Sequence, residues 1–306
     1  MNILSPLYTK LAADYYEEIL ICSKKKENPN LSHGEICEPI EDFINLRGGL
    51  TEYSEKYVFD FFGEPAILIN NSYEKNKYNA IKKLFTSLME SKTLSINFLA
   101  FGKKISPFER FFLEYGLSPK NRFYSLVDLP NSIDSYKSSI RKSYKSLVNW
   151  GRRNLNIEII DHASPNKELF LEFKNLHYEV SKKKTRSDKT WEIQYEMLLK
   201  NEAFLILGFL KDELVTGGYF FSDSKNVFYG SSASRRDLFD KGLMHSIIYE
   251  AINYSATKKL QTIVLGDKLF NFNDAEKKLR DISNFKSGFS NQTASARHYS
   301  GKLGLD

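Results

Sequence analysis

The spacing of apolar residues predicts that helices and strands alternate along the first half of the chain. Leu7, Leu11, Tyr15 and Ile19 recur at four-residue spacing, which predicts a helix over residues 5–25 that cannot continue through Pro29. Extended apolar runs and amphipathic segments follow in turn, as in a mixed sheet covered by helices. The expected strands are 57–62, 66–70, 95–101 and 123–129, and the expected helices are about 74–90 and 107–115.

The second half has a denser pattern. A helix is expected from near Ser132 to about Trp150, with Gly151 ending it. Three strands then come close together, with Asp212 and Asp223 in the turns between them. The remaining expected elements are a strand at 155–160, helices at about 166–182 and 188–200, the three strands at 203–210, 214–222 and 226–233, a helix at about 241–257, a strand at 261–266 and a helix at about 274–283.

This order predicts an α+β fold in which helices flank a mixed sheet. Pro130-Asn131-Ser132 marks a junction, so we expect an accessory α/β domain at 1–130 and a second domain at 131–306. No repeat of 20–50 residues is visible, which argues against a solenoid or propeller.

Composition narrows the class of protein. The chain has 42% apolar residues and only two cysteines, and its N-terminus lacks the charged and apolar regions of a secretory signal. No apolar run approaches the roughly 20 residues that span a bilayer. We therefore expect a cytoplasmic location without a disulfide framework. The net charge of +6 favours phosphate-bearing small molecules over a dedicated nucleic-acid partner.

Four segments resemble those of one superfamily. They are LHYEVSKKKTRSDKTWEIQ (176–194), YGSSASRRDLFDKGLMH (229–245), IVLG (263–266) and ISNFKSGF (282–289). Together with the order helix, three-stranded meander, helix, strand, helix, they resemble the GNAT acyl-CoA N-acyltransferases, and more closely the Fem-like (FemAB-type) branch. That branch contains peptidoglycan-bridge aminoacyltransferases and acyltransferases of surface polysaccharides. The resemblance implies a GNAT-like domain at 131–306 and a degenerate GNAT-like domain at 1–130.

The resemblance also implies a donor site. In GNAT enzymes, backbone N–H groups of a glycine-containing turn at a helix N-terminus hold the pyrophosphate of acyl-CoA. The corresponding residues here are Asp240, Lys241, Gly242, Leu243 and Met244, and Gly242 would let the backbone approach a phosphate. Only one of the two usual glycines is present. Acyl-CoA, most simply acetyl-CoA, is the expected donor because the long inserted hairpin of many tRNA-using relatives is absent; aminoacyl-tRNA is the alternative donor.

Five residues are candidates for the chemistry. The resemblance assigns Lys286 to a position near the transfer centre, where its charge would stabilise a tetrahedral oxyanion. Tyr229 is a candidate proton donor to the leaving group, and Asp267 is a candidate base. His177 and His245 fall in the matching segments and are candidate bases, although a lone histidine on a helix is more often structural. No cysteine or aspartate joins them at metal-ligand spacing, so no metal site is expected.

Basic residues suggest an anionic acceptor. Lys137, Arg141, Lys145 and Arg152 would lie along one line of a helix, which fits either a solvated face or a surface for a nucleotide sugar or a tRNA acceptor stem. Arg186 can bind a phosphate or carboxylate bidentately. The other candidate acceptor-binding residues are Trp191, Gln194 and Arg236.

The sequence favours transfer of an acyl group from a CoA thioester to an amine on an amino sugar or nucleotide-linked sugar of a cell-surface glycan. Three alternatives stay open: an aminoacyl-tRNA-dependent aminoacyltransferase of the peptidoglycan-bridge type, a sugar O-acyltransferase that uses a histidine base, and a non-catalytic module that binds RNA or a partner. The sequence leaves the oligomeric state undetermined.

Overall fold

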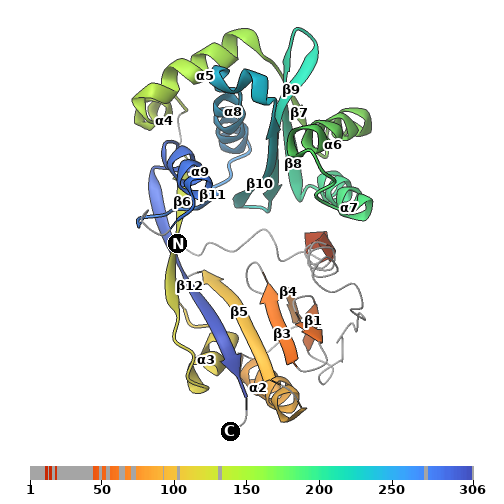
Figure 1. Cartoon of the computed structure of the whole chain (residues 1–306), viewed down its shortest axis with the longest axis vertical. Coiled ribbons are helices and arrows are strands. Elements are labelled where there is room, and N and C mark those ends of the chain that lie inside the picture. The colour runs from red at the N-terminus through yellow and green to blue at the C-terminus, as the bar shows by residue number, and fades with distance from the viewer. Residues whose placement is uncertain are drawn as a thin grey trace. The chain divides into compact units, whose positions relative to one another are not determined.

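A computed structural model describes residues 104–129, 133–271 and 275–304 continuously, together with most of 74–101 and shorter pieces nearer the N-terminus. The chain forms two compact units, which are described separately (Figure 1). Unit 1 comprises Met1–Arg122 and Ser295–Asp306, and unit 2 comprises Phe123–Ala294. The domains predicted at 1–130 and 131–306 stay a prediction, because compactness does not test independent folding.

Unit 2 is built on six strands. They are ordered β6-β11-β10-β9-β8-β7 across the sheet. Strands β7 to β10 form an antiparallel meander, β10 and β11 are parallel, and β11 and β6 are antiparallel. Their bounds are β6 Lys120–Asp128, β7 Asn156–Ile160, β8 Ala203–Leu210, β9 Glu213–Ser222, β10 Asn226–Ser234 and β11 Thr262–Asp267.

Helices cover both faces of this sheet (Figure 1). Gly218 faces Ile247 of α8, whereas its neighbour Gly217 faces Phe173 of α6, because successive residues of a strand point to opposite faces. Trp191, buried at 1% exposure, packs on the α6 side. The bounds are α4 Ile133–Ser139, α5 Lys142–Asn154, α6 Lys167–Ser181, α7 Asp188–Leu199, the 3-10 helix η2 Arg236–Lys241, α8 Leu243–Thr257 and α9 Lys277–Ser287.

Unit 1 contains a mixed sheet segment with its own core. Its strands are ordered β2-β3-β5-β12, where β3 and β5 are parallel and the other pairs are antiparallel. A cluster of phenylalanine rings from α2, β5 and α3 fills the core. The bounds are β1 Ile44–Arg47, β2 Leu50–Glu52, β3 Lys56–Phe61, β4 Ala66–Ile69, α2 Glu74–Ser91, β5 Thr93–Phe101, α3 Pro107–Glu114 and β12 Gln292–Leu303; β1 pairs only with β4.

Most expected elements are confirmed, and three expectations need correction. The helix predicted from Ser132 to Trp150 is two helices, α4 and α5, that part at Ile140 and Arg141. Gly151 does not end a helix: it lies inside α5, where a Cβ would collide with Ser246 of α8. The last strand, β12, was not predicted. The helix expected at residues 5–25 lies largely outside the described residues.

Within the portion of the chain that is described, no helix has both the length and the apolar character needed to cross a membrane.

Candidate active site

Strands β10 and β11 separate in the middle of the unit 2 sheet. Their parallel pairing covers only three residue pairs and ends at Phe228 and Val264. Just beyond that point each strand has an irregularity, at Gly230 in β10 and at Leu265 in β11. A bulge redirects the side chains that follow it, so polar groups of both strands gather where the ladder stops.

Lys286, from the last turn of α9, reaches this divergence. Its ammonium occupies the position that a Cβ on Gly266 would need, and Gly266 has a φ of +118°, in the region that glycine alone enters readily. The same ammonium lies 5.6 Å from the centre of the Tyr229 ring. Burial lowers the pKa of Lys286, and the charge of Asp267 acts in the opposite direction.

Tyr229 stands beside Lys286 as a protonated phenol. Its hydroxyl donates to the Ser232 Oγ at 2.5 Å. Burial raises the pKa of Tyr229 to about 12, with the Ser232 hydrogen bond opposing. A phenol with this pKa can donate a proton to a strongly basic leaving group but does not serve as a base near neutrality.

His245 lies in an aromatic box and also contacts the Gly242 backbone. The centre of its ring is 4.4 Å from that of Tyr144, 5.0 Å from that of Phe285 and 5.8 Å from that of Phe289. Burial lowers the pKa of His245 to about 4; a hydrogen bond to the Gly242 backbone opposes this shift, and the charge of Arg141 adds to it. A neutral, ring-packed imidazole of this kind holds α8 against α9.

The predicted donor turn has the expected position at the N-terminus of α8, but its glycine serves packing. Gly242 has a left-handed φ of +66°, and a Cβ there would lie 2.8 Å from Leu147 of α5. Lys241 is paired with Asp240 at 3.1 Å on the surface, and Leu243 is buried at 2% exposure. Met244 packs against the core. The open side of Gly242 is therefore filled by a neighbouring helix.

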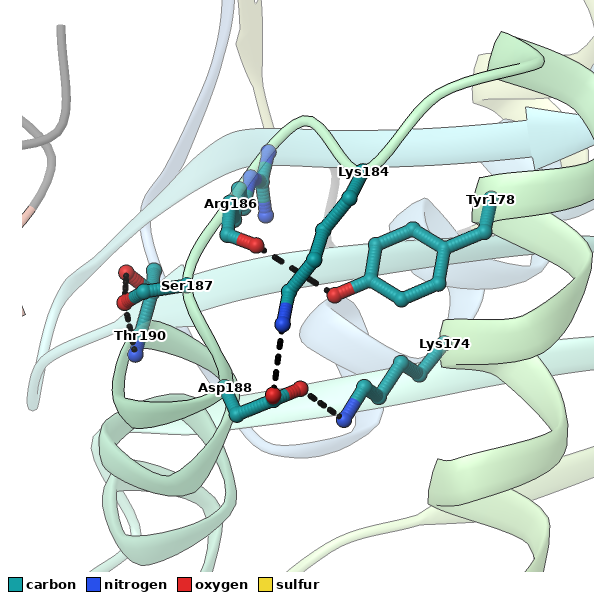
Figure 2. A network of polar contacts seen from close by, with 7 residues as sticks. All are labelled: Lys174, Tyr178, Lys184, Arg186, Ser187, Asp188 and Thr190. Carbon is teal, nitrogen blue, oxygen red and sulfur yellow. Dashed lines mark hydrogen bonds and ion pairs between the residues drawn. The ribbon is translucent and has the colours of Figure 1, made fainter.

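The loop between α6 and α7 is held by a polar network (Figure 2). Asp188 accepts from Lys174 and Lys184 at 2.6 Å each, and these hydrogen bonds lower the pKa of Asp188 to about 2. The Tyr178 hydroxyl donates to the carbonyl of Arg186, and Ser187 caps α7. The guanidinium of Arg186 points away from this network (Figure 2).

The guanidinium of Arg186 contacts uncharged side chains instead. Its Nη1 donates to the Gln194 Oε1 at 3.1 Å and to the Ser231 Oγ at 3.3 Å, and its guanidinium lies 5.2 Å from the centre of the Trp191 ring. Among the described residues, no carboxylate neutralises it. The Nε2 of Gln194 and the Nε1 of Trp191 are buried without a described hydrogen-bond partner. This cluster can accept an anion.

The remaining predicted residues lie apart from these two clusters or have structural contacts. Burial lowers the pKa of His177 to about 4, and its ring packs on Trp191. Lys145 donates to the Ser138 carbonyl, and Arg152 and Arg236 are exposed. Because the helix is broken at Ile140, the predicted basic line that includes Lys137 is not one helical face.

Sequence reasoning missed Gly266, Ser231, Ser232 and Tyr144. Gly266 follows the strand IVL, where a glycine signals a bulge, and that signal was present in the sequence. The two serines and Tyr144 carry no comparable local signal, because only the strand register and the break at Ile140 bring them to this region. Metal-ligating residues form no cluster of three or more within the described segments.

The order and pairing of the strands identify the class of fold. The predicted α+β fold, a GNAT-like mixed sheet flanked by helices, is confirmed. No protein-family model matches the sequence. A search of curated proteins finds no similar sequence.

Several solved structures have a fold similar to that of this chain. The structure of FemX matches with a TM-score of 0.61 at 12% identity, over 92% of this chain and 90% of that one. The C-terminal domain of a putative lysylphosphatidylglycerol synthetase from Agrobacterium fabrum matches with a TM-score of 0.57 at 10% identity, over 84% and 81%. L-PGS from Bacillus licheniformis matches with a TM-score of 0.57 at 11% identity, over 84% and 80%. The predicted likeness to the Fem-like branch is thus confirmed for the fold.

Proposed function

We propose that this protein is an acyltransferase that moves an aminoacyl group from aminoacyl-tRNA to an amine of a peptidoglycan precursor. The carrying observation is Lys286, which is placed at the divergence of β10 and β11 with its ammonium against Gly266 and Tyr229. The fold shared with FemX and with lysylphosphatidylglycerol synthetases supports aminoacyl transfer over acetyl transfer.

The chemistry assigns one role to each group. Attack of the acceptor amine on the donor carbonyl places negative charge on the carbonyl oxygen, and the Lys286 ammonium stabilises it. Asp267 favours the charged form of Lys286. Tyr229 is a protonated phenol that can supply a proton to the departing oxygen of the tRNA ribose. The proton that the attacking amine loses restores the Tyr229 phenol after the ribose oxygen has left, so no histidine base is required.

The fold likenesses favour tRNA over CoA as the donor, which reverses the order of donors expected from the sequence. At the predicted donor turn, a Cβ on Gly242 would meet Leu147 of α5, so this glycine allows close packing of α5 against the start of α8. The backbone N–H groups of Leu243 and Met244 remain the candidate donor contacts, as do the basic side chains of Lys241 and Arg236.

Arg186 is the candidate anchor for the acceptor. It is a cation without a neutralising carboxylate among the described residues, and its planar fork suits a phosphate or carboxylate. Ser231, one of its partners, lies on β10 two residues after Tyr229, across the irregularity at Gly230. The nucleotide-linked amino sugar expected from the sequence is the second acceptor to be tested.

The experiment combines purified protein with a labelled mixture of aminoacyl-tRNAs and a UDP-linked peptidoglycan precursor, and follows transfer of label by mass spectrometry. We expect transfer in the wild type and a loss of about 10²–10³-fold in Lys286→Met, as for removal of an oxyanion donor. Lys278→Met, at an exposed position of the same helix, is the matched control and should keep wild-type transfer.

Parallel reactions contain acetyl-CoA with UDP- and CMP-amino sugars, and free thiol is measured. Turnover with the thioester and none with charged tRNA would overturn the proposed donor. Absence of all transfer, together with salt-dependent RNA binding, would favour the non-catalytic alternative.

A further inference from the structure

The break between α4 and α5 lies directly against the last turn of α9. Ile140 and Arg141 leave the helical conformation, with Arg141 at φ −48° and ψ 131°. No glycine or proline is present in the residues 133–145 to cause the break. A break without a local cause needs compensation from tertiary contacts, since helix interiors lose hydrogen bonds there.

The hydrogen bonds of Arg141 and Tyr144 go to the end of α9, whereas Lys145 spans the break by donating to the Ser138 carbonyl. The backbone N–H of Arg141 donates to the Gly288 carbonyl at 3.0 Å, and its Nη2 donates to the Asn284 carbonyl at 3.1 Å. Its Nη1 donates to the Tyr144 hydroxyl, which in turn donates to the Phe285 carbonyl at 3.3 Å.

Tyr136 completes the set by donating from its hydroxyl to the Phe289 carbonyl at 2.5 Å. The last carbonyls of a helix have no partner within the helix, and a cation near them is favourable. The two helices thus add donors to the Asn284 and Phe285 carbonyls, which the Gly288 N–H also caps, and to carbonyls just beyond the helix.

Gly288 shows how closely the two elements approach. A Cβ at this position would overlap the ring of Tyr144, which is itself buried at 7% exposure. On the sheet side, the Ser287 Oγ lies 3.3 Å from the Ser125 Oγ of β6. The turn that contains Lys286 is therefore held from both sides.

We propose that Arg141 and Tyr144 are positioning residues, which hold the last turn of α9 so that the Lys286 ammonium stays against Gly266. This role differs from the acceptor binding first expected for Arg141. The positioning role rests on the proposed function in one respect: the proposed function makes Lys286 the group whose position matters.

The titration midpoint of the Lys286 amine reports on its position, because it depends on burial and on the charges nearby. The titratable groups around this turn are Asp267 on β11, Tyr229 on β10, Tyr144 on α5 and His245 on α8, and Arg141 contributes a fixed positive charge. If the turn moves, the Lys286 amine becomes more solvated and its titration midpoint rises towards that of an ordinary lysine.

The test is competitive labelling of the whole protein with acetic anhydride over a range of pH, with the Lys286 peptide quantified by mass spectrometry. We expect the midpoint of Lys286 to be higher in Arg141→Ala and in Tyr144→Phe than in the wild type. Tyr144→Phe keeps the ring and removes only the bridging hydroxyl, so it should fold. Lys142→Ala, which removes an exposed charge one residue away, is the control and should leave the midpoint unchanged.

A transfer assay on the same variants separates positioning from binding. We expect kcat to fall about tenfold or more, as misplacement of a charged group does, with little change in KM for the acceptor. An unchanged Lys286 midpoint in both variants overturns the positioning role. If the midpoint shifts but the wild type transfers nothing, the positioning role stands and the proposed function fails.

Discussion

At the scale of single residues, the candidate site depends on a reciprocal fit between Lys286 and Gly266. The lysine is placed where any side chain at position 266 would begin, and the glycine adopts a φ of +118° that other residues avoid. The absence of a side chain at 266 thus defines the position of the charge.

Gly266→Ala is expected to displace Lys286 and abolish most transfer. The strained φ should also lower the free energy of unfolding by about 1–3 kcal/mol. Gly116→Ala separates the two effects, because Gly116 has a φ of +82° with nothing within 4 Å of its Cβ position. Urea denaturation should show a cost for both variants, whereas transfer should fall only in Gly266→Ala. Equal transfer in the two variants would contradict the fit.

The buried histidines predict a fall in stability on mild acidification. His245 and His177 have pKa values of about 4 in the folded protein, against about 6.5 when unfolded. Between these values the unfolded chain binds more protons, so the free energy of unfolding decreases as pH falls from 6.5 towards 4.

Replacing His245 with phenylalanine should reduce this pH dependence and keep the ring contacts. The measurement is urea denaturation at pH 7 and pH 5. His162→Gln is the control at an exposed position and should retain the wild-type decrease. A decrease of wild-type size in His245→Phe would show that His245 does not titrate as its burial implies.

Residue identities in the site were only partly predictable. Lys286 and Tyr229 fall in segments that resemble known relatives, so sequence pointed to them. The contact between Lys286 and Gly266 could not be predicted, since it joins two elements through a positive φ that no spacing reveals. Burial also changes the pKa of His245, whose ring is enclosed by Tyr144 of α5, Phe285 of α9 and Phe289 just beyond α9.

At the scale of elements, the close approach of α5 and α8 depends on Gly151. A Cβ there would collide with Ser246, so Gly151→Ala should lower the free energy of unfolding by about 1–3 kcal/mol. Ser246→Ala alone should be neutral or slightly stabilising, because the Ser246 hydroxyl is buried without a described partner. Urea denaturation of both variants provides the comparison. Equal destabilisation by the two would indicate that the hydroxyl has a partner.

Helices and strands were predicted correctly where apolar residues recur at regular spacing. The prediction failed where tertiary contacts determine the local structure. Strands β8 to β10 have long apolar runs and short turns, and their positions were predicted well. The break at Ile140 depends on hydrogen bonds to the end of α9. No residue type near Ile140 in the sequence therefore indicates it. Strand β12 contains polar residues on both faces, including Arg297 and His298, so its sequence does not resemble a core strand.

At the scale of the whole molecule, one buried ion pair ties β12 to unit 1. Glu109 of α3 has 0% exposure and accepts from Arg297 at 2.5 Å and from Tyr299 at 3.2 Å. Arg297→Ala leaves this carboxylate buried without its cation, which should cost about 3–5 kcal/mol.

The combined change Glu109→Gln and Arg297→Met should recover much of that loss, since no unpaired charge remains. Thermal unfolding that reports on unit 1, such as near-ultraviolet circular dichroism of its aromatic core, is the measurement. Equal losses in the single and the combined variants would mean that the charge pair is not what fixes β12.

The domain boundary near Pro130, expected from local composition, stays a prediction. The compact unit 1 joins residues 1–122 with residues 295–306. Strand β12 pairs with β5, about 200 residues earlier in the chain, and no local sequence pattern predicts such a pairing.

The place of β12 also sets an order of events during synthesis on the ribosome. The residues of unit 2 are contiguous, so its core is complete once residue 294 has emerged. Strand β5 must wait with an open edge for residues 296–303, which pair with it along eight positions. We therefore expect the first-made unit to be the last to finish, and to be the part that most needs a chaperone.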